Sequence, residues 1–483
     1  MHQTSAGAFG SQCRIRFHHI QAHAWTAVTI AGLLGAFAET AVALSRTQPD
    51  SRLLSLNARS QPDLIAESRL PSTSPDSLLP GSEAPAPNLY SESYWTALAD
   101  LDVSELRGVA RSEMEVGFAQ GMTLLTAGEH ERAESAFVVL SKQLTDPNVA
   151  VASQIMLATT LLYQNKWTML RDLPSRSSPE LADRHDVSEL ARWGRAFADM
   201  EPRTVSFPEK PVSLQLKTTV LGTPTIHVRI NGKEYDFWVD TGSSITVLSS
   251  DVASEANVPF LTTDTLTIRT FAGDAPVRPA FVSRMELGTI VFINSPAIVM
   301  EASLMRLRAV GEGIPLAGLP VDGIIGWDTI RHLDVLMDYE RGTITMQKPE
   351  NLGTRGTESQ NLVWIGKPLV QVRTRNGAIL HFTLDTGAQS SFLNALILKK
   401  AEAMTSMASG RVYGLARTGR EAGRVVPSLS VAIGGKSVRL QKLIVYGPSS
   451  SGIVNCDGIL GSDIAQFGRI RIDATNGIFA IDA

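Results

Sequence analysis

The sequence predicts a multidomain protein in which a mainly β, two-lobed region follows an α-helical hairpin domain. The triplet Asp-Thr-Gly occurs twice, at residues 240–242 and 385–387, and each copy ends an apolar run. A longer pattern around each triplet repeats as well, so the second half of the chain contains two copies of one mostly β unit. Apolar residues before residue 200 instead recur at helical spacing. The 483 residues are enough for two or three domains.

The N-terminal 43 residues have the pattern of a secretory leader. Arg14 and Arg16 precede an apolar stretch at 24–38, and residues 41–43 supply a small-x-small cleavage site. We therefore predict a signal peptide over 1–43 and a periplasmic or secreted protein. An uncleaved N-terminal anchor is the alternative, and only that form would contact a membrane.

Residues 44–90 are dense in proline and serine, which predicts a disordered linker. Residues 91–202 predict a helical, tetratricopeptide-like domain, with hairpins at 117–137 and 151–167. A plain helical bundle with the same apolar stripes is the alternative. In either form, we expect this domain to pack on the β lobes or to recruit a protein partner.

Each β unit contains its blocks in the same order. An Asn-Gly hairpin turn, at 231–232 and at 376–377, leads into the strand that ends in the triplet. A later Asp-Gly block completes each copy, and the second copy is ten residues shorter between triplet and block. The repeat predicts two lobes, 208–349 and 360–483.

The blocks around the two triplets, together with the later apolar-apolar-Gly blocks at 324–326 and 459–461, resemble those of the retropepsin-like aspartic proteases. The resemblance covers residues 210–483 and implies a pair of retropepsin-like β-barrel lobes, as in a bacterial single-chain, two-lobed enzyme. It also implies an aspartic endopeptidase whose catalytic residues are Asp240 and Asp385. The residues expected to support the active-site loops are Thr241, Gly242, Ser243, Thr386, Gly387, Ala388, Gly326 and Gly461.

The same resemblance implies how these residues would act. In the family, the two threonines bond across the pseudo-twofold axis, the later glycine blocks pass behind the aspartate loops, and a β-hairpin flap closes over the substrate. The candidate flap residues here are Gly273 in segment 270–275, and Tyr413 with Gly414 in segment 412–416. No metal and no cofactor is implied.

Two carboxylates held within a few ångström cannot both ionise, so one pKa rises while the other falls. A pair that shares one proton can hydrolyse peptide bonds by general acid/base activation of water. The expected substrate is a polypeptide in an extended conformation. Ser243 follows the first triplet and Ala388 the second. Because a hydroxyl can donate to its aspartate, we predict that Asp240 has the lower pKa of the pair.

Four further residues have simpler interpretations. We expect Asp328 and Asp463 to cap or charge-match the helix that each of them begins. Cys456 replaces Val321 of the first lobe, which favours a buried filler over a nucleophile. His381 is expected at a surface strand position.

Composition and topology leave alternatives open. The net charge of −4 and the absence of a basic block give no support to nucleic-acid binding. One alternative function is a non-catalytic peptide-binding or scaffold protein that uses the helical hairpins and β lobes. Another arrangement pairs each lobe with a second chain, although the short link at 349–361 favours pairing within one chain. The helical region could also be an inhibitory pro-segment.

Overall fold

A computed structural model describes residues 92–482 of the chain, with short gaps. The gaps are 144, 178–184, 220–221, 263–264, 271–272, 309, 312–313, 316–318, 351, 353–359, 396, 401–405, 416–417 and 447–452. The predicted leader at 1–43 and linker at 44–90 therefore lie outside the described residues. Within the described part, no helix combines the length and the apolar character needed to span a membrane.

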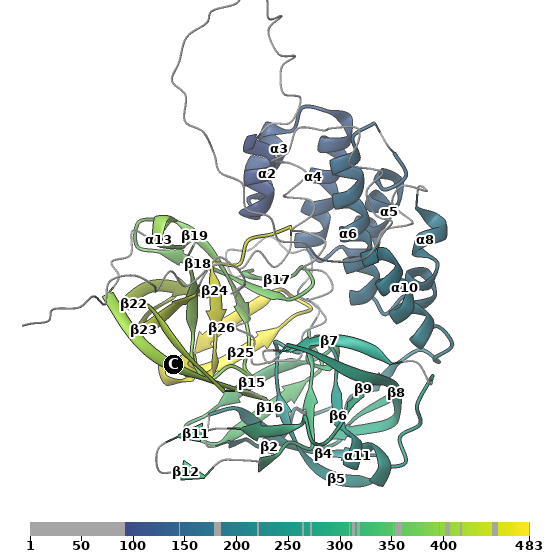
Figure 1. The fold of residues 1–483 in the computed structure, drawn as a ribbon, viewed down its shortest axis with the longest axis vertical. Helices are drawn as coiled ribbons and strands as arrows, with labels where there is room; N and C mark the ends of the chain where they lie inside the picture. Colours follow the sequence, from purple (N-terminus) through teal and green to yellow (C-terminus); the bar gives the residue numbers. More distant parts are fainter. Residues whose placement is uncertain are drawn as a thin grey trace, which may run out of the picture.

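The elements described before residue 200 are helices, which lie together on one side of the β region (Figure 1). They are α2 (Glu92–Ala99), α3 (Val103–Val109), α4 (Glu113–Thr126), α5 (His130–Leu140), α6 (Pro147–Tyr163), α7 (Trp167–Arg171), α8 (Leu173–Arg176) and α10 (His185–Phe197).

Local signals set where these helices begin and how they meet. Ser112 and Glu115 form a reciprocal capping box at the start of α4, and Asp146 accepts hydrogen bonds from two backbone amides of α6. Gly121 of α4 lies so close to Phe137 of α5 that a Cβ atom there would be 2.6 Å from the ring. The two helices are thus in close contact, while their assignment as tetratricopeptide-like hairpins stays a prediction.

Lobe 1, defined here as residues 204–347, is built mainly from strands. Its elements are β1 (Thr204–Ser206), β2 (Val212–Gln215), β3 (Lys217–Thr218), β4 (Pro224–Ile230), β5 (Lys233–Val239), β6 (Val247–Ser249), α11 (Ser250–Glu255), β7 (Leu266–Thr270), β8 (Gly273–Leu287), β9 (Ile290–Met300), β10 (Arg306–Arg308), β11 (Val310–Gly311), β12 (Ile314–Pro315), β13 (Leu319–Pro320), β14 (Gly323–Ile325), α12 (Trp327–Ile330), β15 (Asp334–Asp338) and β16 (Thr343–Gln347). Its main sheet has the order β1-β9-β6-β14-β5-β4-β8-β7, and β3 pairs with β4.

Lobe 2, defined here as residues 362–482, repeats this plan. Its elements are β17 (Leu362–Trp364), β18 (Pro368–Thr374), β19 (Ile379–Leu384), β20 (Phe392–Asn394), α13 (Ile397–Lys400), β21 (Ser406–Leu415), β22 (Thr418–Ile433), β23 (Lys436–Tyr446), β24 (Gly458–Leu460), the 3₁₀ helix η2 (Ser462–Phe467), β25 (Arg469–Asp473) and β26 (Ile478–Asp482). Its sheet has the order β13-β10-β21-β22-β23-β20-β24-β19-β18-β17, so two short strands of lobe 1 extend it.

The strand that ends in each triplet has the same neighbours in both lobes. In lobe 1, β14 runs parallel to β5 and antiparallel to β6. In lobe 2, β24 runs parallel to β19 and antiparallel to β20. The later Asp-Gly block therefore supplies the strand beside each triplet, as the sequence repeat suggests.

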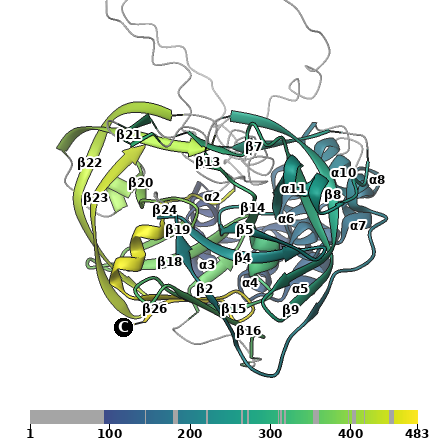
Figure 2. The same ribbon diagram turned by 90° about the horizontal axis from the view of Figure 1, so that it is seen from below.

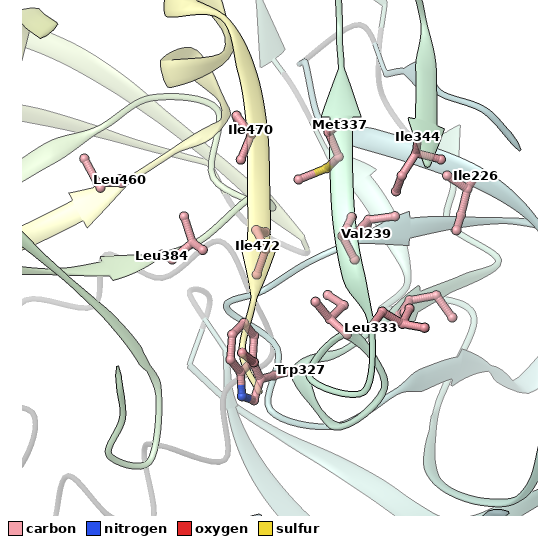
Figure 3. Close-up of a cluster of buried hydrophobic side chains, with 14 of the residues drawn as sticks. Ile226, Val239, Trp327, Leu333, Met337, Ile344, Leu384, Leu460, Ile470 and Ile472 are labelled. Atoms are coloured by element: carbon pink, nitrogen blue, oxygen red, sulfur yellow. The ribbon is translucent and has the colours of Figure 1, made fainter. Parts of the chain in front are cut away.

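A third sheet joins the two lobes, on the side of the β region opposite the β7–β8 and β21–β22 hairpins (Figure 2). Its order is β2-β16-β15-β25-β26, and the contact between lobes is the antiparallel pair β15–β25. Apolar side chains from both lobes form one buried cluster nearby, among them Val239, Met337, Leu384, Leu460 and Ile472 (Figure 3). The two lobes thus share a core as well as a sheet.

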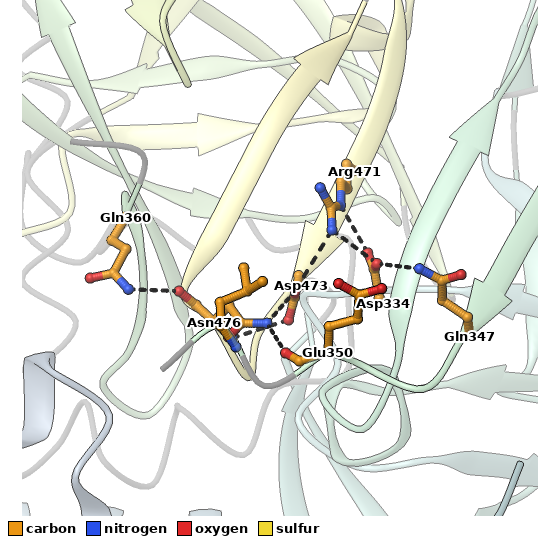
Figure 4. Close-up of polar contacts among 8 residues, drawn as sticks. Asp334, Gln347, Glu350, Gln360, Arg471, Asp473 and Asn476 are labelled. Atoms are coloured by element: carbon orange, nitrogen blue, oxygen red, sulfur yellow. Dashed lines mark hydrogen bonds and ion pairs between the residues drawn. The ribbon is translucent and has the colours of Figure 1, made fainter. Parts of the chain in front are cut away.

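Polar contacts fix the alignment of this shared sheet (Figure 4). Arg471 of β25 donates two hydrogen bonds of 3.0 Å to the carboxylate of Asp334 on β15. The same carboxylate accepts a bond from Gln347 of β16. A two-point arginine–carboxylate contact is directional, so it sets the register of the lobes as well as attracting them.

The helical region packs on both lobes. Asp100 forms a 2.6 Å ion pair with Lys400 of lobe 2, and the ring centroids of Tyr163 and Trp364 lie 5.1 Å apart. On the other side, Arg192 of α10 donates to the carbonyl of Thr265, just before β7 of lobe 1. Of the two roles expected for this region, the structure therefore shows the packing on the lobes.

Candidate active site

Asp240 and Asp385 occupy equivalent loops at the ends of β5 and β19. The backbone amide of Asp240 donates to the carbonyl of Ile325, and that of Asp385 donates to the carbonyl of Leu460, each at 3.0 Å. Both aspartates have no exposed surface. The strand pairing of each lobe therefore delivers one carboxyl group to a buried position.

The two loops are joined by the threonines that follow the aspartates. The hydroxyl of Thr241 donates to the carbonyl of Leu384 at 2.9 Å, and that of Thr386 donates to the carbonyl of Val239 at 2.7 Å. Each hydroxyl also accepts a bond from the backbone amide of the other threonine, at 3.0 and 3.1 Å. These four reciprocal bonds bring the two aspartate loops together within one chain.

The glycines of the triplets let the carboxyl groups approach. A Cβ atom on Gly242 would lie 2.6 Å from Cγ of Asp385, and one on Gly387 would lie 2.5 Å from Cγ of Asp240. Such distances are far inside van der Waals contact, so each glycine leaves room for the aspartate of the opposite lobe.

Gly326 and Gly461 lie directly against the same loops. Space is so tight that a Cβ atom on Gly326 would be 2.5 Å from the carbonyl carbon of Ile245, and one on Gly461 would be 2.7 Å from that of Ser390. The residue after each glycine donates its backbone amide to the loop, from Trp327 to Ser243 in lobe 1. The equivalent bond in lobe 2 runs from Ser462 to Ala388. Both glycine blocks thus support the aspartate loops.

Burial raises the pKa of both carboxyl groups. The pKa of Asp240 lies well above its ordinary value because of burial and, next, because of the charge of Asp385. Burial raises the pKa of Asp385 to about 6, although backbone amides, including that of Ala388, partly oppose this effect. The Oδ2 atom of each residue is buried without a hydrogen-bond partner among the described residues. The pair therefore retains a proton at a pH where isolated carboxyl groups have lost theirs.

The predicted role of Ser243 is wrong. Its hydroxyl donates to the carbonyl of Ile245 at 2.8 Å and leaves Asp240 to backbone donors, the amides of Gly242 at 2.8 Å and Ser243 at 3.2 Å. Asp385 likewise accepts the amide of Ala388 at 2.9 Å. The lower pKa predicted for Asp240 thus loses its basis, because burial raises the pKa of both carboxyl groups.

The two neighbouring acids lie in the first turn of α12 and of η2, as the charge-matching prediction has it, but neither residue is the N-cap. Asp328 forms a buried ion pair with Arg203 and accepts a bond from Thr246. Asp463 instead accepts bonds from the amide and hydroxyl of Ser391 at 2.9 and 2.7 Å. Both carboxylates are held by distant parts of the chain that local spacing does not reveal.

His381 and Cys456 differ in how they compare with expectation. His381 is 3% exposed, so its predicted surface position is wrong, and burial lowers its pKa to about 4. Cys456 is buried as expected, with its sulfur 3.1 Å from the hydroxyl of Thr383.

The candidate flap residues lie near the tips of two hairpins. Gly273 pairs with Thr270 at the end of the β7–β8 hairpin. Tyr413 closes the β21–β22 pairing, and Gly414 pairs with Arg308 of lobe 1. The second hairpin is thus tied to β10, a strand within the longer first copy of the repeat. Closure of either hairpin over a substrate stays a prediction.

Sequence reasoning missed the residues that share a face with Asp240. Side chains alternate along a strand, so Trp238 and Asp240 point to the same side, away from Val239. Through the strand register, Trp238 pairs with Ile324, and Ile324 pairs with Val247. The alternating pattern of β5 was a signal that could have identified this dyad-side face.

One comparison with known proteins matches the part of lobe 1 that contains Asp240. A model of the aspartyl protease family matches residues 226–329. The crystal structure of a retropepsin-like aspartic protease from Rickettsia conorii is similar over 31% of this chain and 96% of its own, with 16% identity and a TM-score of 0.20. No curated protein matches the chain. The aspartyl protease match thus covers the loop of Asp240, while the loop of Asp385 lies outside it and repeats the same strand pairing.

Proposed function

We propose that the chain is an aspartic endopeptidase that hydrolyses peptide bonds of extended polypeptides. The observation that carries this proposal is the pairing of two buried aspartates through reciprocal threonine bonds. The raised pKa values of the pair and the aspartyl protease match over residues 226–329 give further support.

The chemistry follows from a pair that holds one proton. The ionised carboxylate takes a proton from a water molecule and makes it nucleophilic. The protonated carboxyl group donates its proton to the carbonyl oxygen of the scissile bond, and a tetrahedral diol forms. The diol then collapses: the carboxyl group that took the water proton gives it to the departing amine, and the other carboxylate takes back a proton from a diol hydroxyl. Backbone amides of the two loops hold the inner carboxylate oxygens in place, which leaves Oδ2 of each aspartate for the reaction.

The test compares wild type with Asp240→Asn and Asp385→Asn on a peptide library from pH 3 to pH 8. Each substitution removes the acid or the base, so we expect cleavage to fall by about 100-fold or more. Asp251→Asn, at an exposed position of α11, is the matched control and should retain wild-type activity. Cleavage that survives in either dyad variant would refute the proposal.

The pH dependence has a defined direction. Because the pKa of Asp385 is about 6 and that of Asp240 is also raised, acidification below about pH 6 should protonate both groups and remove the general base. A group with a raised folded pKa contributes stability below its ordinary pKa and loses it as pH rises through the folded value. Wild type should therefore lose thermal stability as pH rises from about 4 to above 6, and Asp385→Asn should lose less. An equal loss in both proteins would contradict the raised pKa.

A further inference from the structure

The dyad-side face of lobe 1 is covered in this structure. Trp238, Val247 and Ile324 are 6%, 0% and 0% exposed, and the dyad aspartates beside them have no exposed surface. An extended substrate bound at Asp240 has to lie against this face, because it is the face from which the carboxyl group projects. The face must therefore be uncovered before a polypeptide can reach the dyad.

The cover is a continuous apolar cluster that includes the helical region. Besides the dyad-side face, it contains the β7–β8 hairpin residues Leu266, Ile268, Ala275 and Val277. It extends through buried side chains of the helices, among them Leu170, Trp193 and Phe197.

The helical region also reaches the catalytic loop of lobe 1 itself. Tyr163 and Trp167, at the α6–α7 turn, line the same small cavity as Ser244 and Ile245, which follow Ser243 in the loop of the first triplet. Apolar packing of this kind is more typical of a lasting cover than of a loose neighbouring domain.

Specific polar contacts fasten this cover to both lobes. Lobe 2 is held at Asp100, whose carboxylate pairs with Lys400, and at Ala99, whose carbonyl accepts a 2.6 Å bond from the amide of Asn455. Lobe 1 is held by Arg192, which donates to Thr265 at 3.1 Å, at the entrance to the β7–β8 hairpin. A rigid body attached to both sides of the site opposes the separation of hairpin and sheet that substrate entry needs.

We infer that residues 92–197 act as an internal inhibitor that holds the active-site cleft closed, and that displacement of this helical region from the lobes activates the enzyme. This inference rests on the proposed endopeptidase function. The junction at Glu201 and Pro202 is exposed and lies outside the helices and strands, so a single cut there separates the helical region from lobe 1. The apolar cluster and the polar contacts to both lobes keep the cleft closed, and their loss opens it.

The experiment uses the full chain with a recognition site for an unrelated, site-specific protease inserted between Glu201 and Pro202. A second version adds Asp100→Ala and Arg192→Gln to weaken the fastenings, because a cut helical region can stay bound by its apolar contacts. The rate of cleavage of a peptide library should rise about tenfold or more after the cut, and further in the weakened version. Arg195→Gln, exposed on α10, is the matched control for Arg192→Gln and should leave the uncut rate unchanged.

Hydrogen exchange of segment 238–247 separates failure of this inference from failure of the proposed function. Faster exchange after release, without any peptide cleavage, would support the role of the helical region as a cover and refute the endopeptidase. If the uncut chain already cleaves as fast as the released one, and exchange does not change after the cut, the helical region is not an inhibitor. Asp240→Asn in the released protein should abolish cleavage while exchange remains fast.

Discussion

The two lobes share the framework that holds the dyad and differ in nearly everything that faces the rest of the chain. The parallel pairing of β5 with β14 matches that of β19 with β24, residue for residue. Beyond this framework, Trp238 belongs to the apolar cluster under the helices, whereas its counterpart Thr383 contacts Cys456. The acid after each glycine block accepts a bond from an equivalent hydroxyl, that of Thr246 in lobe 1 and that of Ser391 in lobe 2, but the acid of lobe 1 also forms a buried ion pair with Arg203.

This difference indicates which parts of the repeat the chemistry constrains. The triplet, the strand beside it and the supporting glycine fix the position of a carboxyl group, so both lobes need them. The side chains next to this framework can diverge, because each set contacts different neighbours. The asymmetry of the molecule thus lies around the dyad rather than within the loops that carry it.

The largest effects are expected at the two triplet glycines. Gly242→Ala and Gly387→Ala each force a methyl group to about 2.5 Å from the opposite aspartate, so the carboxyl groups must move apart. Because displacement of about 1 Å can cost about 100-fold in rate, both variants should lose at least that much peptide cleavage. Gly108→Ala, where no atom lies within 4 Å, is the control. A large loss in only one of the two variants would break the symmetry of the loops.

The next largest effects, on stability, should differ between the two lobes. Arg203→Met leaves Asp328 buried without its cation and should lower the free energy of unfolding by about 3–5 kcal/mol. Ser391→Ala removes one neutral donor, the hydroxyl, from Asp463 and should cost about 1–3 kcal/mol. Chemical denaturation measures both values. Adding Asp328→Leu to Arg203→Met should recover part of the loss; if the double variant is as unstable as the single one, the ion pair is not the cause.

The smallest effects should again be symmetric. Thr241→Val and Thr386→Val each remove two bonds across the lobes, one to a carbonyl and one from an amide, which should cost about 1–3 kcal/mol. The double variant should lose less than the sum, because the four bonds form one network between the same two loops, and the loss of the first two loosens the remaining two. Thr204→Val, exposed on β1, is the control. Fully additive losses would show that the four bonds do not act as one unit.

The parts of the site that follow from the family resemblance could be predicted from sequence. Two triplets, each with a later glycine block, carry the resemblance to the retropepsin-like aspartic proteases, and that resemblance implied the threonine bonds across the lobes and the glycines behind the loops. The partner of Asp328 could not be predicted, because Arg203 lies outside the repeat and reaches it only in the folded protein. The direction of the Ser243 hydroxyl was equally hidden: Ile245 offers a carbonyl two residues away, and spacing alone does not choose between acceptors.

Position along a strand did not predict the burial of a side chain where a second layer of structure covers the sheet. His381 alternates with buried residues of β19 and would face solvent in an isolated lobe. In the folded chain the loop between α2 and α3 lies beside it, with Asp100, Leu101 and Asp102 lining the same cavity. The burial of such a residue depends on packing between regions, which a pattern within one strand does not contain.

The sheet that joins the lobes also has a consequence for how the chain folds. Its central pair aligns Asp334 with Asp473 and Met337 with Ile470, so lobe 1 borrows a strand from far along the chain. Closing so long a loop costs conformational entropy before any contact compensates, which slows folding. Before β25 pairs with it, the edge of β15 exposes unpaired backbone groups that can pair with strands of other molecules. We therefore expect lobe 1 alone to be prone to aggregation, and the assembly of the aspartate pair to be among the last events of folding.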